Sequence, residues 1–320
     1  MPICCYECVP CSEGEIANQT DSAACMKCPD DSWPDEMKVM CSLKVVEYLS
    51  FEELLGAALT SLTVFLSIIP AFILWTFVKC RDTPIVKANN RSLSYLLLLC
   101  LVLCFLCSLM FIGKPNITMC KLRQSAFGVI FAVCLSTILA KTITVVMAFG
   151  STRSVAFQQQ CLGNRTPSFI GCFCVLLQVI ICIVWFAYIS PFPEKNIKSY
   201  RNKIILECNE GSVAMFYFML GYLGCLATVC FVVAFLVRKL PDRYNEAKFI
   251  TFSMLIFVSV WLSFIPAYLS TKGKYVVTVE IFAILSSGFG LLSCIFFPKC
   301  YIILLRPDQN IKESIAWRTH

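Results

Sequence analysis

Charged residues are scarce in this chain of 320 residues. Only 15% of its residues are Asp, Glu, Lys or Arg, whereas 58% are hydrophobic. A soluble globular protein of this size needs more polar side chains than this to cover its surface. The shortage excludes an ordinary soluble domain and indicates a protein that lies largely within a membrane.

Seven apolar stretches are long enough to cross a bilayer core of roughly 30 Å as helices of about 20 residues. They run over residues 54–78, 93–112, 122–148, 169–189, 212–237, 249–268 and 276–298. Backbone polar groups inside a bilayer must be satisfied within each segment, which favours helices. The sequence therefore predicts an all-α membrane protein built on a bundle of seven transmembrane helices.

Histidine is almost absent. The chain has a single histidine, His320, which is its last residue. No histidine-dependent catalysis or histidine metal site is available to the rest of the chain, and we expect neither an enzyme nor a cofactor. The middles of the apolar stretches also lack Asp and Glu, which proton pumps and ion transporters place near the bilayer midplane. A seven-helix transporter or channel is kept as the alternative from another functional class.

The distribution of Lys and Arg predicts the orientation, because short cytoplasmic loops are basic. The connections after the first and fifth stretches and the C-terminal tail are rich in these residues: Lys79, Arg81, Lys87, Arg91, Arg238, Lys239, Arg243, Arg306, Lys312 and Arg318. The loop 190–211 argues the other way with Lys195, Lys198, Arg201 and Lys203. The majority of loops predicts a plasma-membrane protein with an extracellular N-terminus and a cytoplasmic C-terminus.

Seven cysteines crowd into the first 41 residues, at Cys4, Cys5, Cys8, Cys11, Cys25, Cys28 and Cys41. Two Cys-x-x-Cys pairs among them imitate a four-thiolate zinc site, but three further cysteines exceed what zinc requires. On an extracellular surface such density indicates a disulfide framework. The odd number leaves at least one thiol to pair outside the block. Cys120 and Cys208, each just ahead of a span, are expected to pair with each other.

The start of the chain has no charged segment followed by an apolar one, as a signal peptide would. Met1-Pro2-Ile3 is followed at once by cysteines. Together with the odd cysteine count, this leads us to expect a part of a longer protein. A fragment or pseudogene product that never signals is a further interpretation.

Four motifs carry a resemblance to a known family. They are Cys4-Cys5-x-x-Cys8-x-x-Cys11, RDTPIVKANNR at 81–91, LPDRYNEAKF at 240–249 and PKCY at 298–301. With them the chain resembles the cysteine-rich linker and seven-helix domain of class C G protein-coupled receptors. LAKTITVV at 139–146 and the short tail LLRPD at 304–308 make it similar to vomeronasal type 2 (pheromone) receptors. Another class C receptor, one that senses calcium or amino acids, is the alternative.

The resemblance implies three parts: an extracellular linker with short β-hairpins at 1–50, a seven-helix domain at 51–300 and a short cytoplasmic tail at 301–320. It also implies the disulfides Cys11–Cys25 and Cys28–Cys41, because the family's linker holds nine cysteines and this chain would carry the last seven. The resemblance further implies that three cysteines pair with residues upstream of this chain: Cys4, Cys5 and Cys8. Cys4 would join the linker to the preceding ligand-binding domain.

Two ionisable residues near the cytoplasmic ends of spans match positions where the family places an inactive-state lock. Lys141 lies deep in the third span, and Glu246 opens the sixth. Such charges are rare because each costs several kcal/mol in hydrocarbon unless it is paired or near an interface. The resemblance implies that the two form an ion pair. The alternative is that Lys141 extends along the helix to lipid headgroups.

On the outer side, the resemblance implies an allosteric pocket for a small amphipathic modulator. Its residues are Phe111, Arg123, Phe127, Trp261, Phe264, Tyr268 and Glu280. The alternative is that these are packing aromatics and interfacial charges.

The expected partners are a heterotrimeric G protein, of the Gi/o type by resemblance, a second receptor chain in a homo- or heterodimer, and membrane lipids. The net charge of +7 suits anionic inner lipids and implies no nucleic acid. The expected G protein contacts are Arg81, Lys87, Arg91, Arg238, Lys239 and Arg243. Asn18, in the sequence Asn18-Gln19-Thr20, is the expected glycosylation site.

Overall fold

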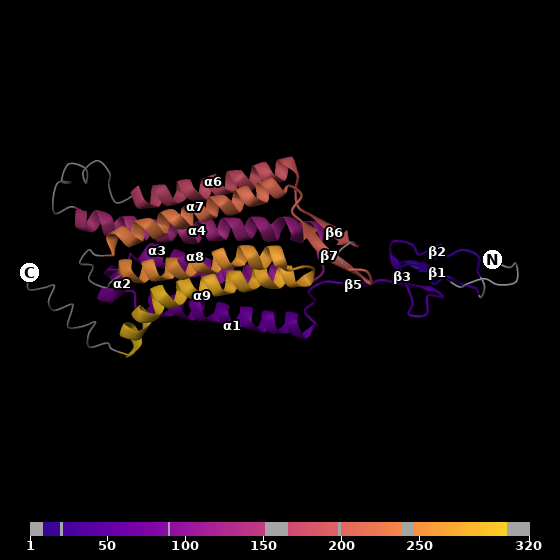
Figure 1. Ribbon diagram of the computed structural model, residues 1–320. Coiled ribbons are helices and arrows are strands. Elements are labelled where there is room, and N and C mark those ends of the chain that lie inside the picture. The colour runs from indigo at the N-terminus through magenta and orange to yellow at the C-terminus, as the bar shows by residue number, and fades with distance from the viewer. Residues whose placement is uncertain are drawn as a thin grey trace, which may run out of the picture.

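The computed structural model describes residues 9–19, 22–88, 90–150, 166–197, 200–238 and 246–305. Within these residues seven helices are long and apolar enough to cross a membrane, and they lie side by side in one bundle (Figure 1). Their bounds are α1 Leu54–Lys79, α3 Arg91–Cys107, α4 Ile117–Gly150, α6 Thr166–Tyr188, α7 Val213–Val237, α8 Glu246–Ser270 and α9 Lys274–Leu305. The predicted seven-helix fold is confirmed.

Two helix boundaries differ from the prediction in a way that matters for function. Helix α4 begins at Ile117 rather than at residue 122, because the Asn116 side chain accepts a hydrogen bond from the Met119 backbone N–H at 2.8 Å and caps the helix. Helix α9 continues through Pro298 to Leu305. Proline is tolerated in transmembrane helices because neighbouring groups satisfy the freed backbone carbonyl.

The linker forms two small β-hairpins that extend from one end of the bundle, called the linker end (Figure 1). Strand β1 (Glu15–Ile16) pairs with β2 (Met26–Lys27), and β3 (Ser32–Pro34) pairs with β4 (Cys41–Leu43). Disulfides join Cys11 to Cys25 and Cys28 to Cys41. Covalent bonds compensate for a core too small to hold itself, and they rule out a thiolate zinc site at these cysteines.

A three-stranded sheet connects the linker to the bundle. Strand β5 (Val45–Glu47) runs parallel to β7 (Lys203–Asn209), which pairs on its other edge with β6 (Phe192–Asn196). Cys208 at the end of β7 is bonded to Cys120 in the first turn of α4. The sheet is therefore attached to the bundle by a covalent bond.

The centre of the bundle is formed by α3, α4 and α9. The buried share of the apolar stretch is 61% in α4 and in α9 but only 17% in α6, which places α6 at the edge. The core includes fully buried Leu97, Leu135 and Leu292. The 3₁₀ turn η1 (Ser108–Phe111) extends α3 at the linker end, and the short helix α2 (Pro84–Ala88) lies at the other end, called the opposite end (Figure 1).

Candidate functional site

A buried ionic network joins three helices near the opposite end. Glu246, the first residue of α8, accepts a hydrogen bond on Oε1 from Lys141 Nζ of α4 at 3.0 Å and another from Lys299 Nζ of α9 at 2.9 Å. The Lys141, Lys299 and Glu246 side chains are 1%, 4% and 11% exposed. We call these three residues the charged network.

The burial of Lys141 excludes the alternative that its ammonium reaches the lipid headgroups. A lysine that extends to the headgroups keeps its charged end in water or at the interface, whereas this side chain is almost fully covered. Removing one partner of a buried pair leaves an uncompensated charge and costs about 3–5 kcal/mol in soluble proteins. The network therefore holds α4, α8 and α9 in one arrangement more strongly than a surface ion pair would.

Lys299 had no predicted role, although it lies in one of the motifs that carry the family resemblance. The seventh span was predicted to end at Pro298, which put Lys299 outside the membrane. In the structure α9 continues past that proline, so Lys299 is buried. The rarity of lysine within an apolar stretch, the argument applied to Lys141, would have identified it.

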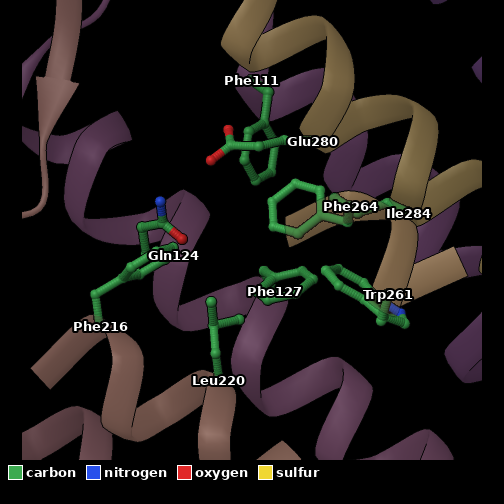
Figure 2. Close-up of a pocket in the computed structure, with 9 residues that line it drawn as sticks. All are labelled: Phe111, Gln124, Phe127, Phe216, Leu220, Trp261, Phe264, Glu280 and Ile284. Carbon is green, nitrogen blue, oxygen red and sulfur yellow. The ribbon is translucent and has the colours of Figure 1, made fainter. Parts of the chain in front are cut away.

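The predicted pocket at the linker end is a small chamber walled by aromatic rings from several helices (Figure 2). Its lining residues are Phe111, Gln124, Phe127, Phe216, Leu220, Trp261, Phe264, Glu280 and Ile284. The Phe127 ring lies 5.5 Å from that of Trp261, and the Trp261 ring lies 5.2 Å from that of Phe264. The cavity is about 20 Å³, which is room for one water molecule.

Several polar atoms in or beside the chamber are buried and, within the described residues, have no hydrogen-bond partner. They are Arg123 Nε, Gln124 Nε2, Trp261 Nε1 and Glu280 Oε2. In Figure 2 the Glu280 carboxylate and the Gln124 amide lie on the same side of the ring cluster. Buried polar groups are normally hydrogen-bonded to protein or to ordered water. The chamber is therefore suited to a small group that both accepts and donates hydrogen bonds.

Five of the seven residues predicted for this pocket line the chamber, and the other two lie beside it. The Arg123 guanidinium lies 5.1 Å from the centre of the Phe111 ring and borders an adjoining cavity under the sheet. Tyr268 donates a hydrogen bond to Glu210 Oε1 at 3.1 Å. In the described part of the chain, no ion pair within 4.0 Å joins Arg123 to Glu280, so these two charges do not contact each other directly.

The chamber also contains residues that the prediction missed: Gln124, Phe216, Leu220 and Ile284. Gln124 could have been found, because it follows Arg123 directly and a glutamine within a span is costly without a partner. The three apolar residues carried no signal, since every span is rich in such side chains.

A group of ion pairs at the linker end connects the linker to β7 and to the start of α9. Glu47 in β5 contacts Lys274 Nζ at 2.8 Å and Lys203 Nζ at 3.3 Å, and Lys274 also contacts Glu53 at 3.0 Å. The hydrogen bond from Lys274 lowers the pKa of Glu47 below its ordinary value of 4.5, although burial acts in the other direction. Because Lys274 is the first residue of α9, these contacts join the linker to that helix. These ion pairs were not predicted from the sequence.

The basic residues predicted to contact a G protein are described in part. Arg81 precedes α2 and Lys87 lies in its last turn. They lie 3.7 Å and 3.8 Å from Asp82, with mostly exposed side chains. Arg91 opens α3, and the Arg238 guanidinium stacks on Phe235 at 3.6 Å. Helix α2, the start of α3 and the end of α7, which hold or adjoin these four residues, lie at the opposite end (Figure 1). Lys239 and Arg243 lie outside the described residues.

The remaining predicted residues belong to the linker. Asn18 is exposed just after the first strand, which leaves it accessible to a glycan. The cysteines expected to pair with upstream residues lie outside the described part of the chain: Cys4, Cys5 and Cys8.

Comparison with known proteins agrees with this architecture. The family profile described as "7 transmembrane sweet-taste receptor of 3 GCPR" matches residues 49–299, and the "Nine Cysteines Domain of family 3 GPCR" matches residues 1–34. These two matches cover the bundle and most of the linker.

Similar curated proteins are receptors rather than enzymes. Vomeronasal type-2 receptor 26 of Mus musculus is 53% identical over 98% of the chain and 37% of its own length. The extracellular calcium-sensing receptor of Homo sapiens is 48% identical over 99% of the chain and 30% of its own length. The chain thus spans about a third of these relatives. It belongs to family 3, or class C, of the G protein-coupled receptors, with seven membrane-spanning helices and the linker that precedes them.

Proposed function

We propose that the chain is the signalling part of a chemosensory receptor of the vomeronasal type 2 kind, which couples to a heterotrimeric G protein of the Gi/o type at the opposite end. The linker end would be extracellular and the opposite end cytoplasmic. Class C receptors couple to G proteins and often form dimers, and the greater identity to vomeronasal type-2 receptor 26 than to the calcium-sensing receptor supports this assignment within the class.

The observation that carries the proposal is the charged network. It joins α4, α8 and α9 at the end where the basic residues of α2 and α3 lie. A two-state receptor needs contacts that are present in one state and lost in the other. A carboxylate shared by two lysines supplies such a contact, because moving the first turn of α8 outward would break both bonds together.

Movement of the linker would reach the bundle at the linker end of α4. The linker is joined to β7 through β5, and β7 is bonded to the start of α4 through Cys120–Cys208. Lys141 lies on the same helix, and 21 residues of α-helix at 1.5 Å each place it about 32 Å from Cys120 along the axis. Displacement of the linker would therefore move a rigid element that carries one member of the charged network.

The chamber is proposed as an allosteric site in the same scheme. Its walls come from η1, α4, α7, α8 and α9, so a bound molecule would alter the packing of α4, α8 and α9, which also carry the charged network. At about 20 Å³ the chamber would have to open to accept a drug-sized molecule, because such sites are about 300–1,000 Å³.

The test is a chimera in which the ligand-binding domain of a class C receptor of known ligand precedes this chain. Ligand-induced activation would be measured with sensors for the separate G protein subtypes at matched surface expression. The expected result is a response of the Gi/o sensors. A chimera that reaches the surface and binds ligand but activates no subtype would refute the proposal, and a response of another subtype alone would refute the Gi/o assignment.

The second candidate function is sensing of calcium or amino acids, favoured by the 48% identity to the calcium-sensing receptor. Because ligand recognition in the family depends on a domain outside this chain, the two candidates differ in the stimulus and not in the bundle. Attaching the natural upstream domain and applying calcium, amino acids or peptides in turn would separate them.

A further inference from the structure

A crevice between α7 and α8 is open to the outer surface of the bundle. Its volume is about 440 Å³, which lies in the range of about 300–1,000 Å³ typical of small-molecule sites. Tyr217, Leu262, Ile265 and Leu269 border it and are 50–68% exposed. Both helices are membrane-spanning candidates, so the opening faces lipid hydrocarbon.

Two glycines create much of this space on the α7 side. Gly221 and Gly224 line the crevice, and a Cβ added at either would meet no described atom within 4 Å. Glycine costs a helix about 1 kcal/mol relative to alanine. Since the packing of the described chain does not require these glycines, the space that they leave open is available to another molecule.

The shape of the crevice restricts what can fill it. On α7 the lining runs from Phe216 to Thr228, which is about 18 Å at 1.5 Å per residue. Over that length the side chains that line the crevice are almost all apolar, which suits one extended hydrocarbon chain.

The two ends of the crevice differ in polarity. The hydroxyl-bearing rings of Tyr217 and Tyr268 border it near the linker end, where tyrosine suits the membrane interface. Deeper in the bundle, the Thr228 hydroxyl donates to the Gly224 carbonyl at 2.8 Å and so presents little polarity to the crevice. Trp261 also lines it, and its buried Nε1 has no hydrogen-bond acceptor among the described residues.

We propose that this crevice binds a single lipid acyl chain, with its carboxyl-derived head beside Tyr217 and Tyr268 and its hydrocarbon tail against the two glycines. The chain could come from a free fatty acid or from an outer-leaflet phospholipid, which share this chemistry. The crevice and the chamber have common walls, formed by Phe127, Phe216, Leu220, Trp261 and Phe264. An acyl chain would thus contact aromatic side chains that also line the chamber, which places it next to the proposed allosteric pocket.

The test uses the full chain in phosphatidylcholine nanodiscs with two photoreactive probes: a free fatty acid, and a phosphatidylcholine that carries the same photoreactive chain. Labelled peptides would be mapped by mass spectrometry in the wild type, in Gly221→Leu/Gly224→Leu, and in Cys225→Leu. The control residue Cys225 is an exposed position on the same helix that does not line the crevice.

At least one probe should label α7 and α8 at the crevice, the double leucine variant should lose that label, and Cys225→Leu should keep it. The probe that labels identifies the source of the chain. Equal labelling of the wild type and the double leucine variant would overturn the proposal, as would displacement of the acyl probe by a sterol but not by unlabelled fatty acid. A cross-link between α8 helices of two copies with no acyl label would show a dimer face instead.

A second variant keeps the proposal testable if the leucines prevent folding. Gly221→Ala/Gly224→Ala favours the helix and narrows the crevice by two methyl groups. Added fatty acid should raise the thermal unfolding temperature of the wild type, because a ligand that binds only the folded state stabilises it. The alanine variant should show a smaller rise and weaker labelling; an unchanged rise and unchanged labelling would contradict the proposed site.

Discussion

Lys299 donates a hydrogen bond to Glu246 Oε1 at 2.9 Å, the same oxygen that accepts from Lys141. The carboxylate is thus shared by lysines of two other helices, α4 and α9, and the first turn of α8 cannot move away without breaking both contacts. This arrangement makes Glu246 the central member of the charged network.

The first prediction concerns Lys299. Replacing it with alanine should raise ligand-free G protein activation, because the inactive arrangement loses one of two bonds to Glu246. If the bond contributes about 1.4 kcal/mol to that state, the balance moves about tenfold towards the active state. Basal signalling at matched surface expression measures this. Lys79→Ala is the matched control, since Lys79 lies at the end of α1 and contacts Trp75, and its signalling should not change.

The second prediction is a pH dependence at the linker end. The lowered pKa of Glu47 means that its ion pairs stabilise the fold above the ordinary value of 4.5 and that this contribution is lost as the pH falls through the lowered pKa. Glu47→Gln should therefore reduce the thermal unfolding temperature at pH 7, by the equivalent of about 0.2–1 kcal/mol for a partly exposed pair. The difference from the wild type should shrink as the solution is acidified.

Glu52→Gln is the control for this measurement, because Glu52 is exposed in the same segment and makes no ion pair in the described part of the chain. A Glu47→Gln deficit that stayed constant from pH 7 to acid pH would show that the contacts, rather than the charge, account for the loss.

The third prediction concerns the disulfide between Cys120 and Cys208. Its removal by Cys120→Ala should destabilise the chain by about 2–5 kcal/mol and uncouple β7 from α4. Cys208→Ala and the double variant should behave like the single one, because each removes the same bond. Thermal unfolding of purified protein gives the comparison, with the exposed free cysteine Cys172 replaced by alanine as the control. A Cys120→Ala variant as stable as this control would be incompatible with a bond here.

The fourth prediction assigns the G protein surface. Changing Arg238, Lys239 and Arg243 together to alanine should reduce coupling in the chimera and leave surface expression unchanged, because the change removes positive charge next to the proposed cytoplasmic end of the bundle. The control is the triple alanine variant of Lys114, Lys121 and Lys195 near the linker end. It carries the same charge change and removes no ion pair in the described part of the chain. Equal coupling in both variants would refute the assignment.

Much of this fold could be predicted from the sequence, because the spans depend on local hydropathy and the disulfides depend on where the cysteines lie relative to the spans. The seven spans follow from runs of apolar residues, and the pairing of Cys120 with Cys208 follows from their positions just ahead of two spans. The sheet could not be predicted in the same way: β5 pairs with β7 across a sequence separation that includes four spans, and three-residue strands carry little periodicity.

The two ends of the bundle differed in how well their residues could be predicted. Lys141 and Glu246 stood out because charges are rare in spans, whereas Lys299 was missed through the assumption that Pro298 ends a helix. At the chamber four of the five aromatic residues were identified, but the distance between Arg123 and Glu280 depends on side-chain rotamers and helix rotation. Neither property can be read from residue spacing alone.

The most direct test of the account is a double-mutant cycle on Lys141 and Glu246, read as ligand-free G protein activation at matched surface expression. Lys141→Ala and Glu246→Ala should each raise basal activity, by about tenfold for every 1.4 kcal/mol of inactive-state stabilisation that is lost. The double variant should add little to Glu246→Ala, because that change already removes the contact with Lys141. Additive effects, or no rise in either single variant, would contradict the claim that the charged network holds the receptor inactive.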